Sequence, residues 1–60
     1  MTLIELARTR HSIMILREDA FRLCREVPED KERSTLAFAY ATASLRLLAE
    51  IIELKVNGAA

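Results

Sequence analysis

The stretch that decides the fold is Ser34 to Val56, STLAFAYATASLRLLAEIIELKV. Apolar residues recur in it at spacings of three and four, which is the period of an α-helix. They form two stripes: the Leu36 stripe (Leu36, Tyr40, Ala43, Leu47, Ile51, Leu54) and the Phe38 stripe (Phe38, Ala41, Leu45, Leu48, Ile52). A helix that packs against one neighbour needs one apolar stripe. The second stripe therefore predicts a second neighbour.

The residues before this stretch predict a first helix, from about residue 3 to residue 26. Thr2 and Glu5 have the spacing of a capping box, in which each side chain accepts a hydrogen bond from the backbone N–H of the other residue. Val27 precedes Pro28, and the residue before a proline is disfavoured in the helical conformation. The first helix should therefore end just before Val27.

Pro28 suits the first turn of a second helix, because its missing N–H is not needed there. We expect this helix from about residue 29 to residue 56, with Asn57-Gly58 as its stop. A tight turn at residues 27–28 makes the two helices antiparallel neighbours. The predicted fold is all-α: one domain, an antiparallel two-helix hairpin that assembles into a homo-oligomeric helical bundle.

The length of the chain is the second reason to expect self-association. The chain has 60 residues, and a domain of this size buries a small fraction of its surface. Its single cysteine, Cys24, excludes an internal disulfide, and no histidines and cysteines have metal-ligand spacing. Of the usual ways to stabilise a small fold, association remains.

The charges of the chain cancel, with nine basic and nine acidic residues spread evenly. Proteins that bind long nucleic acids normally carry a basic excess on one face, so no DNA partner is expected. No uninterrupted apolar run approaches the roughly 18 residues of a membrane span, and the N-terminus lacks a secretory pattern. We therefore expect a cytoplasmic protein without a membrane partner.

Arg10 and Arg17 fall on the apolar side of the first helix, between residues of its main apolar stripe. A guanidinium in such a place must be paired, reach an edge or meet a ligand. One hypothesis is a salt bridge to Glu50 or Glu53 of the second helix, or to a neighbouring subunit. The other is a phosphate clamp between subunits, because arginine offers a two-pronged hydrogen-bond donor.

The start of the second helix offers further candidate ligand groups. Arg33, Ser34 and Thr35 place a guanidinium and two hydroxyls where a phosphodiester could bind, although hydroxyls near helix starts usually serve the backbone. Tyr40 lies on the Leu36 stripe and could stack on a base, although most such residues belong to a core. Arg10, Arg17, Arg33, Ser34, Thr35 and Tyr40 are therefore the candidate ligand-binding residues.

Nothing in the sequence has the pattern of a catalytic site. There is no pair of nucleophile and base, no glycine-rich phosphate loop and no acid/base pair of carboxylates. Glu50 and Glu53 share a face, but the Glu-x-x-His spacing of two-metal bundle sites is missing. We expect neither enzymatic activity nor a metal or other cofactor.

Pro28 to Glu53 resembles the helical hairpin domain of phage proteins that sequester immune signalling nucleotides, the anti-CBASS and anti-Thoeris sponges. The resemblance is carried by Pro28 at the turn, by Glu32 and Ser34 in a P-x-x-x-E-x-S pattern, and by small residues such as Ala43 along one side of the helix. It covers less than half of the chain. The family often has an aromatic residue where this sequence reads Leu45-Arg46-Leu47.

The resemblance implies a phage anti-defence protein in the host cytoplasm. Such proteins form compact homo-oligomers, typically hexamers, so a hexamer is favoured over a dimer. They hold cyclic di- or trinucleotides between subunits without cleaving them, which would place Arg33 and Ser34 at the phosphates.

Two other hypotheses stay open. The chain could be a small regulator, a dimeric four-helix bundle that binds RNA or a partner protein through Arg8, Arg22 and Arg25. It could also be a purely structural assembly subunit.

Overall fold

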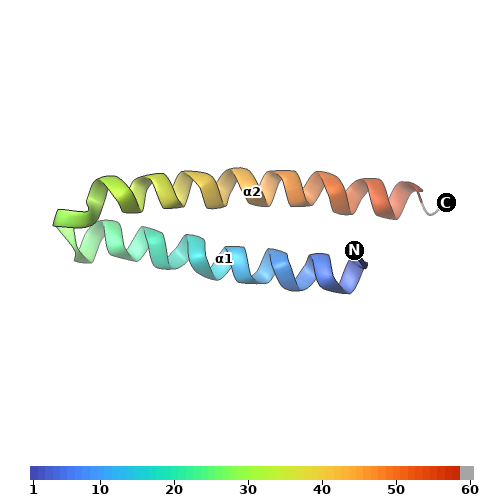
Figure 1. Ribbon diagram of the computed structural model, residues 1–60, viewed down its shortest axis with the longest axis horizontal. Coiled ribbons are helices and arrows are strands. Elements are labelled where there is room, and N and C mark those ends of the chain that lie inside the picture. Colours follow the sequence, from blue (N-terminus) through green and yellow to red (C-terminus); the bar gives the residue numbers. More distant parts are fainter. Residues whose placement is uncertain (59–60) are drawn as a thin grey trace.

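The computed structural model describes residues 1–58 as a helical hairpin. In this range α1 spans Leu3–Glu26, a short 3₁₀ turn, η1, spans Pro28–Asp30, and α2 spans Lys31–Gly58. The two helices lie side by side and antiparallel, and α2 extends beyond the start of α1 (Figure 1). The hairpin measures 49 × 15 × 13 Å. The prediction of an all-α helical hairpin is confirmed.

The capping box fixes the start of α1. The Thr2 hydroxyl accepts a hydrogen bond from the Glu5 N–H at 3.1 Å, and the Glu5 carboxylate accepts one from the Thr2 N–H at 3.3 Å. Thr2 itself is extended, with φ of −80° and ψ of 163°. Two of the N–H groups that a helix start leaves unpaired are thus satisfied, as the spacing of Thr2 and Glu5 predicts.

Replacing this cap should lower the stability of the protein measurably. Thr2→Ala removes the acceptor for the Glu5 N–H, and loss of such a cap costs about 1 kcal/mol. In a domain of this size that corresponds to a fall in Tm of roughly 4 to 8 °C. Thermal unfolding followed by circular dichroism measures it, with Thr2→Ser as the control that keeps the hydroxyl. An equal Tm for the Ala and Ser variants would contradict the role of the cap.

The turn differs from the prediction in one detail. Val27 leaves the helical conformation, with φ of −126° and ψ of 80°, as the following proline requires. Pro28 to Asp30 then form a 3₁₀ turn, in which the Asp30 N–H donates to the Val27 carbonyl at 3.0 Å. The α-helix therefore begins at Lys31 rather than at residue 29, because a 3₁₀ turn often precedes a helix.

Within the described residues α2 ends at Gly58, two residues beyond the expected end at about residue 56. Asn57 and Gly58 both belong to α2, and Gly58 does not adopt a positive φ. A glycine ends a helix in the left-handed conformation, so this glycine does not serve as that kind of cap.

The Phe38 stripe is the one that packs inside the hairpin. Its five residues are all half-buried, and they face α1. On α1, Leu6 and Ala20 are the apolar residues that are almost fully buried, at 1% and 5% exposure. The hydrophobic interior of one protomer is therefore very small.

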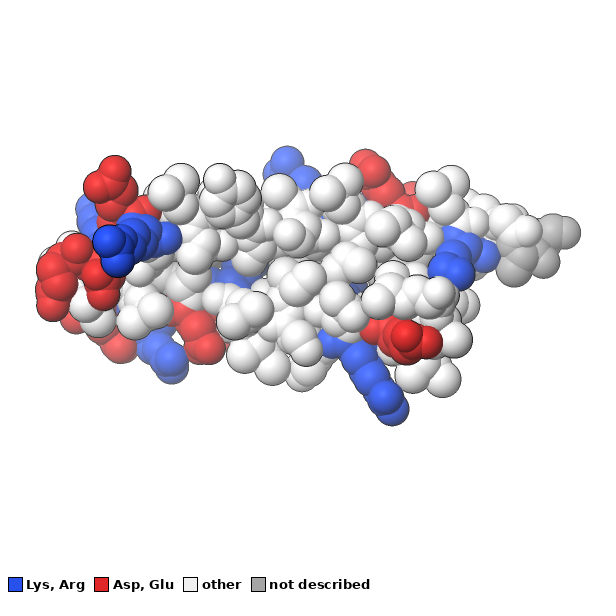
Figure 2. All heavy atoms as spheres, viewed as in Figure 1, with Lys and Arg blue, Asp and Glu red and all other residues white. Residues whose placement is uncertain are grey.

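The Leu36 stripe, by contrast, has no neighbour within the protomer. Leu36 is 53% exposed, Tyr40 71%, Leu47 61%, Ile51 44% and Leu54 71%. Figure 2 shows a largely uncharged surface that spans both helices in the middle of the hairpin. Monomeric proteins rarely leave a long contiguous apolar surface in water. The described residues, 1–58, therefore do not supply the second neighbour that two stripes predict.

The two stripes also make the second helix apolar overall. By length and composition the segment Pro28–Gly58 could cross a membrane. No uninterrupted apolar run has the length of a membrane span, but residues 35–52 contain only two charged residues, Arg46 and Glu50. A helix that is apolar on two faces resembles a membrane span in length and composition.

Candidate anion-binding groove

Among residues 1–58, Arg17 is held between the two helices by groups other than a carboxylate. Its Nε donates to the Thr42 hydroxyl at 2.9 Å, and its guanidinium lies 4.7 Å from the centre of the Phe38 ring. The Thr42 hydroxyl in turn donates to the Phe38 carbonyl at 2.9 Å. The side chain of Arg17 is half-buried. Both partners are neutral, so the guanidinium is oriented while its charge stays uncompensated.

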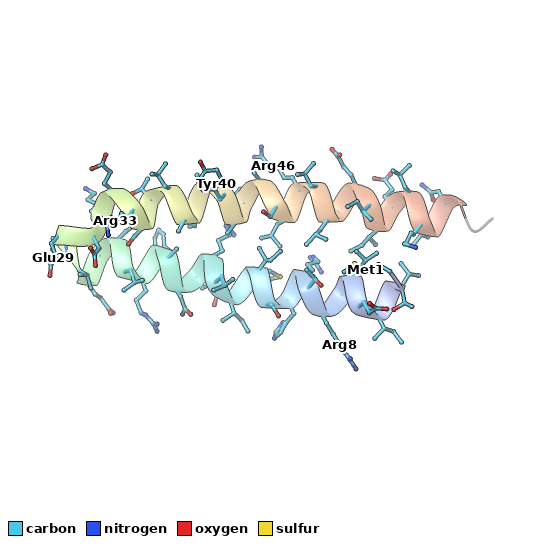
Figure 3. The ribbon with its side chains drawn as sticks, viewed as in Figure 1. Met1, Arg8, Glu29, Arg33, Tyr40 and Arg46 are labelled. Carbon is cyan, nitrogen blue, oxygen red and sulfur yellow. The ribbon has the colours of Figure 1, made fainter. Side chains whose placement is uncertain are left out.

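Two further arginines lie on the same side of the hairpin. A groove of about 370 Å³ is lined by Arg10, Arg17 and Arg46, and we call it the arginine groove. Its other lining residues are neutral: Met14, Thr42, Leu45 and Ala49. Arg10 and Arg46 are exposed, and Arg46 projects from the outer side of α2, at the rim of the groove (Figure 3). Arg17 therefore forms the floor and the other two arginines form the rim.

The predicted salt bridges to Glu50 and Glu53 do not form within residues 1–58. The ion pairs in this range join Arg22 to Asp19, at 3.1 Å, and to Glu26, at 3.9 Å. Glu53 lines a second hollow together with Arg10 but stays beyond ion-pair distance. Arg17 bonds to Thr42 instead, because Thr42 faces α1 directly. Pairing with a neighbouring subunit stays a prediction.

Ser34 and Thr35 lie in different environments from Arg33. Ser34 is 5% exposed and packs between the helices. The Thr35 hydroxyl donates to the Lys31 carbonyl at 2.7 Å and lies 3.6 Å from the sulfur of Cys24. Within the protomer Thr35 thus serves the backbone, and the half-buried Cys24 packs beside it. Arg33 and Thr35 are both exposed, whereas Ser34 is buried.

Arg33 and Tyr40 lie on another side of α2 from the arginine groove. They are seven residues apart and therefore share a helical face, whereas Tyr40 is two residues from Thr42 and points away from it. Arg33 stands at the turn end of the hairpin and Tyr40 further along α2 (Figure 3). The structure thus brings Arg10 and Arg17 together but does not bring Arg33 or Tyr40 to them within one protomer.

The arginines proposed as RNA contacts are largely engaged. Arg22 pairs with the carboxylates of Asp19 and Glu26. The guanidinium of Arg25 lies 4.9 Å from the centre of the Phe21 ring. Arg8 alone points freely away from α2 (Figure 3). This arrangement offers little continuous positive surface to an RNA backbone.

Sequence analysis missed Thr42 and Arg46 as members of the groove. Thr42 lies four residues after Phe38 and Arg46 four residues after Thr42, so the three residues lie near one another along one side of α2. Placing them opposite Arg17 and Arg10 requires the pairing of the two helices, which the spacing within one helix does not contain. Among residues 1–58 no three His, Cys, Asp or Glu side chains gather as a metal site.

Comparison with protein-family models, with curated proteins and with solved structures finds no match to this chain.

Proposed function

We propose that this chain is a self-associating, non-catalytic subunit that sequesters a cyclic di- or trinucleotide, with the phosphates bound in the arginine groove. The observation that carries the proposal is the environment of Arg17. A half-buried guanidinium normally has an anionic partner, and Arg17 has a hydroxyl and an aromatic ring instead. Arginine binds phosphate oxygens in a two-pronged geometry, so a phosphate is the partner that best fits this position.

The choice of a cyclic nucleotide rests on the resemblance of Pro28 to Glu53 to the phage sponges. The same resemblance supports an anti-defence role in the host cytoplasm and a hexameric assembly. The uncovered Leu36 stripe supports self-association independently, because burial of its leucines and isoleucine would give the stabilisation that the small interior of one protomer does not.

A position in water rather than in a membrane is part of the proposal. Arg46 lies near the middle of the segment Pro28–Gly58. An arginine at the centre of a membrane-spanning helix costs about 2.5 to 3.5 kcal/mol on insertion scales. In the proposed assembly the same arginine stands at the rim of a ligand groove, where its charge is favourable.

The proposal is tested by calorimetric titration of the purified protein with a panel of cyclic di- and trinucleotides. We expect saturable binding of at least one of them, and recovery of that nucleotide intact after the protein is denatured and the ligand is analysed by chromatography. Absence of binding across the panel would contradict the proposal. Recovery of linear products would show that the protein is an enzyme.

A further inference from the structure

A row of arginine and phenylalanine side chains continues from the floor of the arginine groove toward the turn. The guanidinium of Arg17 lies on the Phe38 ring, the Phe38 ring lies 5.9 Å from the Phe21 ring, and the guanidinium of Arg25 lies on the Phe21 ring. The two rings are tilted by 46°. We call these four residues the Arg–Phe row. Arg17 and Arg25 thus flank two aromatic rings, and α1 and α2 both contribute to the row.

The Arg–Phe row lines a hollow that adjoins the arginine groove. The hollow has a volume of about 460 Å³, and Arg17 lines both it and the arginine groove. Ligand pockets for small molecules begin at about 300 Å³. Phe21 is 50% exposed, so its ring is accessible to a molecule that enters the hollow.

The charges differ between the two cavities. Three arginines line each cavity, but the arginine groove has no carboxylate in its lining, whereas the hollow has Glu18 and Glu26, of which Glu26 lies 3.9 Å from Arg22. The two carboxylates make the hollow less favourable to a phosphate than the arginine groove. A neutral planar ring is not repelled by them, and amino groups on such a ring could donate hydrogen bonds to them.

We propose that the Arg–Phe row binds an aromatic base, and that this base belongs to the same ligand whose phosphate lies in the arginine groove. This inference rests on the proposed function, because it requires that the arginine groove binds phosphate. Stacking on aromatic rings and on guanidinium planes is how proteins hold unpaired bases without reading a sequence. The row therefore selects a nucleotide over a phosphate that carries no base.

The test compares adenosine 5′-monophosphate with ribose 5-phosphate, which has the same phosphate and sugar but no base. Titrations followed by protein NMR measure both affinities under one condition. We expect the mononucleotide to bind roughly tenfold or more tightly, the effect of stacking one base on an aromatic side chain. Phe21→Leu should remove this difference and leave the affinity for ribose 5-phosphate unchanged.

The outcomes separate this inference from the proposed function. If both compounds bind to the unchanged protein with equal affinity, the Arg–Phe row does not bind a base, whereas the proposal of phosphate binding is kept. If Tyr40→Leu removes the preference and Phe21→Leu does not, the base stacks on the other side of α2 and the inference is wrong. If neither these compounds nor the cyclic nucleotides bind, both the proposed function and the inference of base binding are wrong.

Discussion

Leu47→Asp should dissociate the assembly while leaving each hairpin helical. Leu47 lies in the middle of the Leu36 stripe and is 61% exposed in the protomer, so an aspartate there disturbs little of the packing within the hairpin. In an assembly that covers this stripe, the change removes a buried leucine and introduces a charge into an apolar contact. Loss of the leucine alone costs about 2 to 3 kcal/mol in each subunit, or roughly 100-fold in affinity.

The small interior of one protomer supports an effect of this magnitude. Few other apolar contacts are present to compensate, because Leu6 and Ala20 are the only nearly buried apolar residues in the described part of the chain.

Ala39→Asp is the matched control for this prediction. Ala39 is exposed on the same helix and belongs to neither apolar stripe, so the control adds the same charge outside the proposed contact. Light scattering coupled to size-exclusion chromatography measures the mass in solution, and circular dichroism measures the helix content. A Leu47→Asp protein with the mass of the unchanged assembly would show that the Leu36 stripe is not an interface.

The double change Arg17→Gln with Arg46→Gln should abolish binding of cyclic nucleotides. Each arginine that contacts a phosphate contributes about 1.5 to 3 kcal/mol through charged hydrogen bonds, so loss of two contacts should weaken binding by roughly 100-fold or more. Glutamine at position 17 can still bond to the Thr42 hydroxyl, which keeps the packing between the helices. The effect is therefore on the charge and not on the fold.

Two further variants locate the site. Arg8→Gln removes one positive charge from an exposed arginine outside the groove, and it should leave the affinity within about twofold. Arg33→Gln tests the position that the family resemblance implies. If Arg33→Gln abolishes binding and the double change does not, the phosphate site lies at the start of α2 and the arginine groove is not the site.

The hairpin was predictable because its signals are local. Thr2 and Glu5 define the start of α1 through contacts three residues apart, and Pro28 enforces the turn through its own backbone. The two stripes of α2 also follow from spacing within one helix. What spacing does not determine is which stripe faces α1, and the structure shows that it is the Phe38 stripe.

The site was predictable only in part, because its members come from both helices. Arg10 and Arg17 stood out as charges on an apolar side, and they do share a groove. Thr42, Arg46 and the contact of Phe21 with Phe38 depend on the pairing of α1 with α2, which residues on one helix do not reveal. Ser34 was expected at a ligand, but it faces α1 because it lies four residues before Phe38, on the packed side of α2.

Copies of this hairpin are proposed to assemble, and the assembly is proposed to bind nucleotides. Native mass spectrometry of the purified protein, with and without cyclic di- and trinucleotides, tests both parts in one measurement. We predict an assembly larger than a dimer, with a hexamer expected, that gains a fixed small number of intact nucleotides. A monomer, or a dimer that gains no nucleotide from the panel, would contradict the claim.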